Sequence, residues 1–199
     1  MSMRGRERSL TVLELVWSLD LPWRKAVAVL SFVVLTALCA KARIPLPFTP
    51  VPITFQTFAV LLSGLALGPY LGLASTALYL AIGLSGLPIF SMGGGLSYLL
   101  GPTGGYLVGF LLASHVVGRL AWRGWDRSYL RCLAAMGIGE LLIYLPGLLW
   151  LSRFVPKGSL LAAGLIPFIP GDLIKIGLIT LCLPTVWRLT GRSGEVDRG

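Results

Sequence analysis

Hydrophobic positions follow one another in long unbroken runs along this chain and do not alternate with polar ones. Between Arg43 and Arg119, 75 consecutive residues include no Asp, Glu, Lys or Arg. A helix that crosses a bilayer needs about 20 mostly apolar residues, whereas a water-facing surface needs charged side chains. The pattern therefore predicts an all-α integral membrane protein.

Six apolar runs, bounded by charge, Pro or Gly, are candidate transmembrane helices. They lie near residues 25–43, 53–67, 69–86, 102–121, 129–151 and 170–189. The run at 53–67 is short for a perpendicular crossing. Because six spans with short connections nearly fill 199 residues, we expect one membrane domain at 25–190. A cytoplasmic or interfacial segment at 1–24 and a cytoplasmic tail at 191–199 flank it.

Composition supports this class and excludes others. The chain is 55% hydrophobic and only 13% charged, with a net charge of +9, and its mean hydropathy is +0.82. The basic residues flank apolar runs and form no stripe with interleaved aromatics, so they do not indicate nucleic acid. Cys39, Cys132 and Cys182 fall in or beside apolar runs, where we expect small core residues and neither disulfides nor a metal site.

The distribution of Lys and Arg predicts the orientation, because short cytoplasmic loops are enriched in them. One side of the predicted map carries twelve: Arg4, Arg6, Arg8, Arg24, Lys25, Arg119, Arg123, Arg127, Arg131, Arg188, Arg192 and Arg198. The other side carries four: Lys41, Arg43, Arg153 and Lys157. We therefore expect a multi-pass protein of the cell membrane with both termini in the cytoplasm.

The segment before the first span, residues 1–24, lacks the features of a signal peptide. Glu14 and Asp20 interrupt its apolar run, and no small-residue cleavage site follows. An interfacial helix over residues 10–19, with Trp17 at the level of the lipid headgroups, is the prediction here.

Three connections on the predicted outer side are rich in Pro or Gly: IPLPFTPVPIT, GLPIFSMGGGLSYLLGPTGG and SRFVPKGSLLAAGLIPFIPG. Irregular backbone near membrane depth must be buried in protein or line a watery cavity. We expect these loops to pack together over a ligand pocket. In the fourth span, Gly101, Gly105 and Gly109 should share one face and permit close helix contact.

Two opposite charges open the last span. Pro170 and Gly171 begin the helix, which places Asp172 in its first turn and Lys175 three residues later on the same face. Such charges cost roughly 2.5 to 3.5 kcal/mol each inside a bilayer on insertion scales. They form either an internal ion pair or the grip for a small ligand with an anionic end and hydrogen-bond donors.

Four other polar residues lie in or beside the spans. Glu140 lies about eleven residues into the fifth span, either as a pocket wall or hydrogen-bonded to a neighbouring helix. Gln56 lies at the outer start of the second span, and the same two alternatives, a pocket wall or a hydrogen bond to a neighbouring helix, apply to it. Lys41 and Arg43 are expected to reach out to the membrane interface.

A second class of function is a rhomboid-like intramembrane protease. The sequence Gly83-Leu84-Ser85-Gly86 fits its GxSG pattern, and His115 is the available base. However, the predicted spans put Ser85 at the outer end and His115 in the cytoplasmic half. No HExxH, GxxxxGK[ST] or GxGxxG occurs, so we expect no catalytic residue, cofactor or metal, and any energy for transport must come from elsewhere.

From about residue 26 to about residue 190, the chain resembles the BioY family, the biotin-specific capture subunits (S components) of energy-coupling factor transporters. The residues that carry this resemblance are RIPLPFTPVPITFQTFAVLLSGLALGP, GLSGLPIFSMGGGLSYLLGPTGGYLVGF, IYLPGLLW and IPGDLIK. It implies a six-helix subunit that captures biotin from outside the cell. A transmembrane coupling protein and two cytoplasmic ATPases would be its partners, with ATP used by those partners.

The resemblance also implies roles for single residues. The family's D-x-x-K, which contacts biotin, falls on Asp172 and Lys175. An outer-loop Asn of some members has its place in FSMGGG here, so its hydrogen bond is either lost at Met92 or replaced by glycine backbone such as Gly93.

Three questions stay open at this level. The small-residue pair by which such subunits dock on their coupling partner is represented only by Thr36 and Ala40. Capture of another vitamin by the same fold is an alternative to biotin. Action as a solitary homo-oligomer is an alternative to the coupled form.

Overall fold

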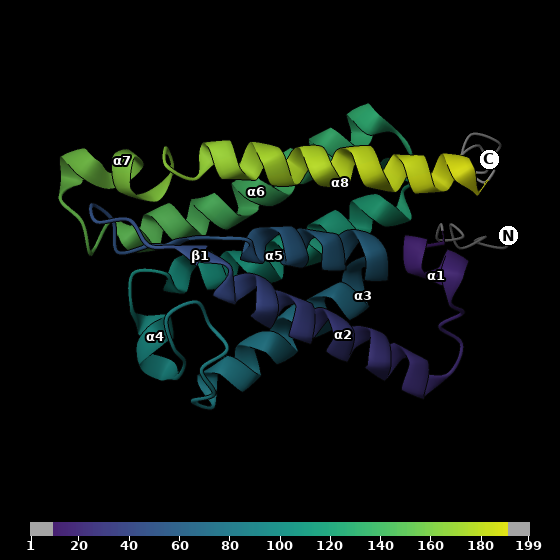
Figure 1. Ribbon diagram of the computed structural model, residues 1–199, viewed down its shortest axis with the longest axis horizontal. Coiled ribbons are helices and arrows are strands. Elements are labelled where there is room, and N and C mark those ends of the chain that lie inside the picture. Colours follow the sequence, from purple (N-terminus) through teal and green to yellow (C-terminus); the bar gives the residue numbers. More distant parts are fainter. Residues whose placement is uncertain (1–9, 191–199) are drawn as a thin grey trace, which may run out of the picture.

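The computed structural model describes residues 10–190, without the side chain of Val16. Its elements in chain order are α1 (Val12–Val16), α2 (Pro22–Lys41), β1 (Arg43–Ile44), β2 (Ile53–Thr54), α3 (Gln56–Leu84), α4 (Leu96–Leu100), α5 (Gly104–Trp122), η1 (Trp125–Arg127), α6 (Tyr129–Leu151), η2 (Lys157–Ser159), α7 (Leu160–Gly164) and α8 (Ile169–Leu189) (Figure 1). The predicted tail at 191–199 and five of the counted arginines lie outside the described residues: Arg4, Arg6, Arg8, Arg192 and Arg198.

Helices dominate this structure, as the apolar runs predict. Within the described residues, five helical stretches are long and apolar enough to cross a membrane: α2, α3, α5, α6 and the stretch Lys157–Leu189, which ends in α8. A mostly helical fold with several candidate membrane helices is therefore confirmed, and the described residues add one short strand pair, β1–β2.

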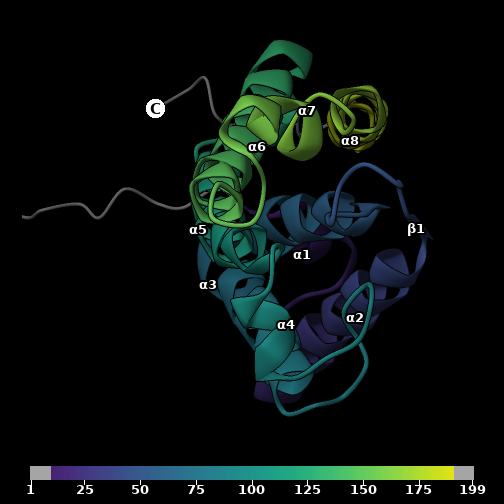
Figure 2. The same ribbon diagram turned by 90° about the vertical axis from the view of Figure 1, so that its left-hand side faces the viewer.

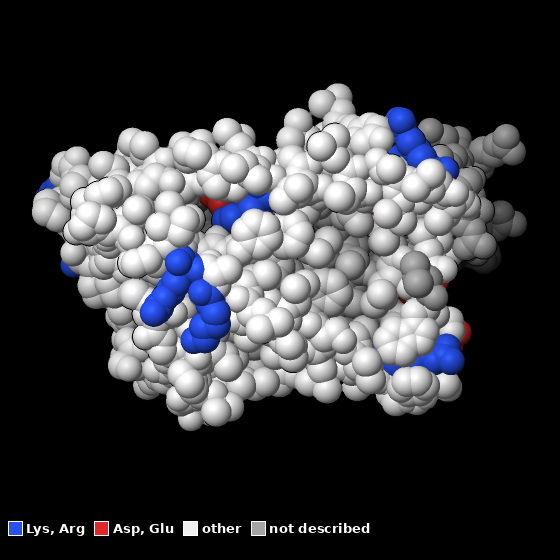
Figure 3. Space-filling model, viewed as in Figure 1, with Lys and Arg blue, Asp and Glu red and all other residues white. Residues whose placement is uncertain are grey.

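The outward faces of α6 and α8 carry large apolar side chains. Leu149, Leu173 and Leu181 are 73%, 63% and 64% exposed. Figure 3 shows the same property over one face of the molecule, where Lys, Arg and a few acidic residues gather in small groups on a mostly uncharged surface. Such a surface is stable against lipid tails and not against water.

Helix α3 is interrupted by a turn at Gly68. This residue has φ 79° and ψ −178°, which a side chain would disfavour, and Pro69 follows it. A Cβ added at Gly72 would lie 2.9 Å from Gly64 Cα, although residues eight apart in a continuous helix are separated by about 12 Å. The chain therefore folds back at Gly68, and α3 consists of two arms, 56–67 and 69–84, that lie side by side.

Small residues let α5 approach its neighbours closely. A Cβ at Gly109 would lie 2.7 Å from Ile143 Cα of α6, and one at Gly118 would lie 2.5 Å from Pro69 N of α3. The predicted row of glycines is wrong at its first member. Gly101 precedes α5, which begins only at Gly104, and its carbonyl accepts a hydrogen bond of 2.9 Å from Trp150 Nε1.

The three Pro- or Gly-rich connections lie together at one end of the helices (Figures 1 and 2). The first contains the antiparallel pair β1–β2, the second contains α4, and the third contains η2 and α7. The opposite end holds α1 and the end of α8 (Figure 1). This arrangement separates a loop-covered end from an end with short connections.

The amino-terminal helix is shorter than the predicted interfacial helix over 10–19. Helix α1 begins after Thr11, whose backbone N–H donates to the Glu14 carboxylate at 2.9 Å, and ends before Trp17. This reciprocal cap fixes the first turn. Thr11 is buried, and the Trp17 ring packs edge-on against Trp23 with centroids 5.9 Å apart, so the segment packs on the protein itself.

Asp126 in η1 connects three parts of the fold at the end away from the loops. Its Oδ2 accepts a hydrogen bond of 2.6 Å from Trp187 Nε1 of α8. The Arg127 guanidinium lies 4.1 Å from the centre of the Trp187 ring and donates to the Leu10 carbonyl at 3.5 Å. Burial raises the pKa of Asp126 to about 6, although the Trp187 hydrogen bond and the Arg127 charge lower it.

This raised pKa predicts a pH-dependent stability. Because the folded protein holds the Asp126 proton up to about pH 6 and the unfolded chain only up to its ordinary value of 3.8, stability is full below the lower value. It decreases as the pH rises through about 6, by up to about 3 kcal/mol. We expect Asp126→Asn to remove this component, as measured by the difference in Tm between variant and wild type across that range in detergent. A difference that does not change with pH contradicts it.

Candidate functional site

A cavity lies beneath the three connections at the loop-covered end and, together with its solvent-open mouth, encloses about 540 Å³ of empty space. Residues of each connection line it: Val51 and Pro52 from the first, Ser91 and Tyr98 from the second, and Phe168 from the third. Helices α3, α5, α6 and α8 supply the remaining walls. The cavity is therefore assembled from segments that are far apart in the sequence.

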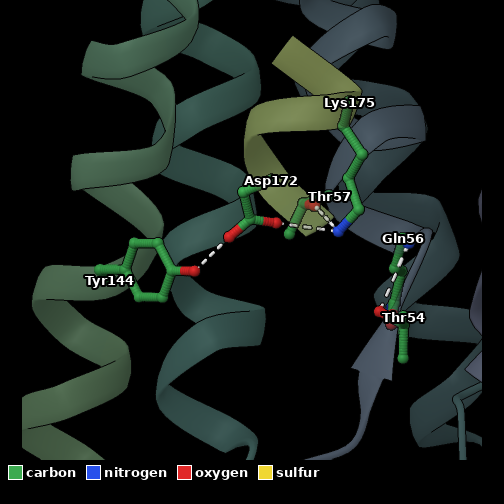
Figure 4. Close-up of polar contacts among 6 residues, drawn as sticks. All are labelled: Thr54, Gln56, Thr57, Tyr144, Asp172 and Lys175. Carbon is green, nitrogen blue, oxygen red and sulfur yellow. Dashed lines mark hydrogen bonds and ion pairs between the residues drawn. The ribbon is translucent and has the colours of Figure 1, made fainter. Parts of the chain in front are cut away.

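Asp172 and Lys175 of α8 form the charged wall of this cavity (Figure 4). Lys175 Nζ lies 2.9 Å from Asp172 Oδ1 and donates a second hydrogen bond, of 3.0 Å, to Thr57 Oγ1 of α3. The Tyr144 hydroxyl of α6 donates to Asp172 Oδ2. Both charged residues are buried, so these contacts offset much of the cost of removing the charges from water.

The pair still has capacity for a ligand. An ammonium has three donors, and within residues 10–190 Lys175 uses two of them. A carboxylate has about four lone-pair sites, and Asp172 receives two donors. Lys175 can donate to an anionic or carbonyl oxygen, while Asp172 can accept from an N–H group beside it.

Gln56 is also on the cavity wall, at the first residue of α3. Its side-chain amide donates to the Tyr79 hydroxyl at 2.8 Å, and that hydroxyl donates to the Ile89 carbonyl at 3.2 Å. This relay fixes the Gln56 side chain and ties it to the second connection.

The rest of the cavity is mainly apolar and aromatic. Tyr106, Leu107 and Phe110 from α5 and Ile143 from α6 form one wall. The Tyr106 hydroxyl donates to the Gly164 carbonyl at 2.8 Å, which holds the third connection over this wall. An apolar wall beside a few convergent polar groups is typical of a site for a small organic molecule.

Lys41 and Arg43, expected to reach the membrane interface, hold the second connection in place. Lys41 Nζ donates to the Phe90 carbonyl at 2.8 Å and also to the Pro88 carbonyl, and Arg43 donates to the Ser91 carbonyl. Three carbonyl groups of one loop are thereby satisfied from the end of α2 and the start of β1. Ser91 Oγ in turn lies 2.5 Å from the Tyr98 hydroxyl at the cavity.

Met92 and Gly93 lie in this loop but not on the cavity wall. Met92 is 51% exposed, and the Gly93 carbonyl accepts a hydrogen bond of 3.0 Å from Phe90 N. Ser91, the neighbour of Met92, lines the cavity instead. The glycine-rich backbone decides which side chain turns inward, and its positive φ at Gly93 and Gly95 is not readable from residue spacing.

Glu140 is buried with 6% exposure and lies outside this cavity. It lines a second hollow between α6 and α8, to which Asp172 and Tyr144 also belong. Of the two alternatives from the sequence, a pocket wall fits this place, although the wall belongs to the second hollow. The carboxylate has no hydrogen-bond partner among the described residues.

Thr36 and Ala40, the expected docking pair, are buried inside the chain. Thr36 Oγ1 donates to the Phe32 carbonyl of its own helix at 2.7 Å. The burial of this pair, which α2 turns towards the rest of the protein, gives no support to docking at this place.

Ser85 and His115 do not form a catalytic pair. His115 Nδ1 lies 3.2 Å from the Pro69 carbonyl, at the turn of α3, while Ser85 Oγ donates to the Ile82 carbonyl at the other end of the same arm. The sixteen steps along the helix from Pro69 to Ser85 span about 24 Å. Ser85 and His115 are thus too far apart to exchange a proton, as the protease alternative requires.

Tyr144 and Thr57 were not predicted from the sequence. Tyr144 follows Glu140 by one helical turn, which is the signal that could have placed it on the same face. Thr57 reaches Lys175 only through the packing of α3 on α8, for which the sequence holds no comparable signal.

Known proteins resemble this chain in amino-acid sequence and in fold. The model of a family described as BioY family matches residues 9–192. The chain belongs to the BioY family. This BioY-family chain is 41% identical over 145 residues to the probable biotin transporter BioY of Pyrococcus horikoshii, a match that covers 72% of this chain and 84% of that protein.

Two further relatives support the same assignment. The biotin transporter BioY of Thermotoga maritima is 38% identical over 142 residues, which covers 70% of this chain and 83% of the relative. The crystal structure of the S-component for biotin from an ECF-type ABC transporter superposes with a TM-score of 0.70 at 26% identity, over 92% of this chain and 95% of that one. These relatives are transporters, so the BioY-family chain is not assigned as an enzyme, and the protease alternative is wrong.

Proposed function

We propose that this chain is the membrane subunit that captures biotin from outside the cell for ATP-driven uptake with a separate coupling module. The observation that carries the proposal is the match over nearly the whole chain to a biotin S-component, with a buried Asp172–Lys175 pair facing the cavity beneath the three connections. The names of the bacterial and archaeal relatives give the same ligand.

The cavity offers chemistry that suits biotin, which has a ureido head, an apolar body and a valerate carboxylate. Lys175 donates to an oxygen of the ligand, and Asp172 accepts from an N–H group. The aromatic and aliphatic wall of α5 and α6 buries the apolar body, and Gln56 and Ser91 add polar contacts near the connections. We assign the binding role to these residues rather than to Met92 or Gly93.

We further propose six membrane crossings: α2, the two arms of α3, α5, α6 and α8. An even number returns the chain to the side on which it started, consistent with α1 and the end of α8 lying at one end (Figure 1). The excess of Lys and Arg in connections at that end favours a cytoplasmic location for both termini. The cavity then faces the outside, where biotin is captured.

The partners proposed are a transmembrane coupling protein and two cytoplasmic ATPases. Support comes from the ECF-type ABC transporter named for the structural neighbour and from the lack of a nucleotide-binding motif in this sequence. Because Thr36 and Ala40 are buried, docking uses another part of the surface.

The identity of the co-purified ligand tests this function. The protein is purified in mild detergent from cells grown with biotin and then denatured, and the released small molecules are identified by mass spectrometry. We expect biotin in a ratio approaching one per chain. If a different vitamin is released, that vitamin and not biotin is the ligand of this fold. A protein that releases nothing and fails to bind added biotin contradicts the proposal.

A further inference from the structure

A second hollow lies between α6 and α8, is open to the outside of the molecule, and encloses about 510 Å³ together with its open mouth. Its walls are apolar apart from Glu140, Tyr144 and Asp172. Tyr144 and Asp172 line both this hollow and the ligand cavity. The hydrogen-bonded Tyr144–Asp172 pair therefore stands between Glu140 and the space in which a ligand would bind.

Glu140 has no hydrogen-bond donor within the described part of the chain, and both of its carboxylate oxygens are shielded from solvent. An ionised carboxylate normally requires donors or a cation to compensate for lost hydration. The one cation among the residues that line the two hollows is Lys175, and its charge is already matched by Asp172 at 2.9 Å. A neutral, protonated Glu140 satisfies these surroundings better than an ionised one.

The titratable groups that line the two hollows come from α4, α5, α6 and α8. The charged groups among the residues that line the two hollows are Asp172 and Lys175 of α8 and Glu140 of α6. The other titratable groups on these walls are Tyr98 of α4, Tyr106 of α5 and Tyr144 of α6. No second cation is present among these lining residues to balance an additional negative charge.

Charge balance then links Glu140 to the ligand. Lys175 and Asp172 together are neutral, so an anionic ligand leaves the buried cluster with one net negative charge. An ionised Glu140 would add another negative charge in a site of low dielectric, where repulsion is strong. We propose that Glu140 is a proton-holding residue of the capture site, which must be protonated for the site to bind a ligand carboxylate tightly. This inference rests on the proposed capture of biotin.

Glu140 acts here through charge and not through contact, because the Tyr144–Asp172 pair separates it from the ligand cavity. Linkage fixes the sign of the effect: if the bound state holds more protons than the free state, affinity falls as the pH rises. The limit for one proton is about tenfold in Kd per pH unit. Glu140→Gln imitates the protonated form in size and charge, so this variant should keep the affinity that the wild type has at low pH.

The experiment measures the Kd of biotin for the full chain in detergent between about pH 6 and about pH 9, a range in which the ligand carboxylate stays ionised. We expect wild-type affinity to fall with rising pH and the Glu140→Gln variant to lose that dependence. The control variant Glu14→Gln, which changes a carboxylate of α1 at the far end, should retain the wild-type profile. Biotin methyl ester, which lacks the negative charge, should show a weaker pH dependence with the wild type.

Identical profiles of wild type and Glu140→Gln overturn the proposal. Should the variant fail to fold, calorimetric titration of the wild type with biotin in two buffers of different ionisation enthalpy decides instead. Proton uptake on binding makes the observed binding enthalpy differ between the two buffers. Equal binding enthalpies in both buffers across the pH range refute the inference. Wild-type binding with a flat profile overturns the role of Glu140 alone. Absence of wild-type binding at every pH overturns the proposed function as well.

Discussion

Replacement of Lys175 by methionine should weaken biotin binding by at least about 100-fold. A charge-assisted hydrogen bond from a buried cation contributes about 1.5–3 kcal/mol, and loss of one partner of a buried pair costs about 2–5 kcal/mol. A factor of 100 corresponds to about 2.7 kcal/mol, within this range. Equilibrium binding of labelled biotin to the purified variant measures the loss.

Two controls separate binding from folding in this experiment. Lys157→Met removes an exposed lysine of η2 and should leave the Kd unchanged. The double variant Asp172→Asn/Lys175→Met leaves no unpaired charge, so it should retain its Tm while still losing biotin. Tight binding by the double variant would mean that the pair only joins α8 to α3 and α6, and the site assignment would fail.

Substitution of Gly118 by alanine should destabilise the fold by about 1–3 kcal/mol, the usual cost of overpacking. The added Cβ would lie 2.5 Å from Pro69 N and 2.6 Å from Gly68 C, which are backbone atoms of the α3 turn and cannot rotate away. A chain of this size loses about 2–4 °C in Tm for each kcal/mol. Thermal unfolding of the detergent-solubilised protein provides the measurement.

Gly177→Ala is the matched control, because nothing lies within 4 Å of a Cβ at this position of α8. The same chemical change is made within a helix in both variants, and only the space differs. Equal Tm values for the two variants would show that the close approach of α5 to the Gly68 turn does not contribute to stability.

Much of the architecture could be predicted from local pattern. The apolar runs place the long helices because a bilayer core imposes a fixed minimum length on each span. The boundary between the runs 53–67 and 69–86 coincides with the turn at Gly68, since Gly followed by Pro interrupts a helix. The spacing of Asp172 and Lys175 predicts their shared face, and the ion pair of 2.9 Å has that geometry.

Contacts between segments could not be predicted in the same way. Whether Lys41 points to lipid headgroups or to the carbonyls of residues 88 and 90 depends on where the second connection lies, and that depends on positive φ values at Gly86, Gly93 and Gly95. The burial of Thr36 and Ala40 depends on the rotation of α2 about its own axis, since its apolar residues surround it almost uniformly. A single sequence holds no strong signal for either choice.

The turn at Gly68 also determines how much protein lies below a bound ligand. The arm 56–67 has twelve residues, or about 18 Å of helix, whereas the hydrocarbon core of a bilayer measures about 30 Å. Gln56 and Thr57 line the cavity at one end of this arm, and the turn closes the other end. About three helical turns therefore lie between the cavity and the turn, where Thr11 and Trp122 pack against Gly68, so a captured molecule sits in the loop-covered part of the protein.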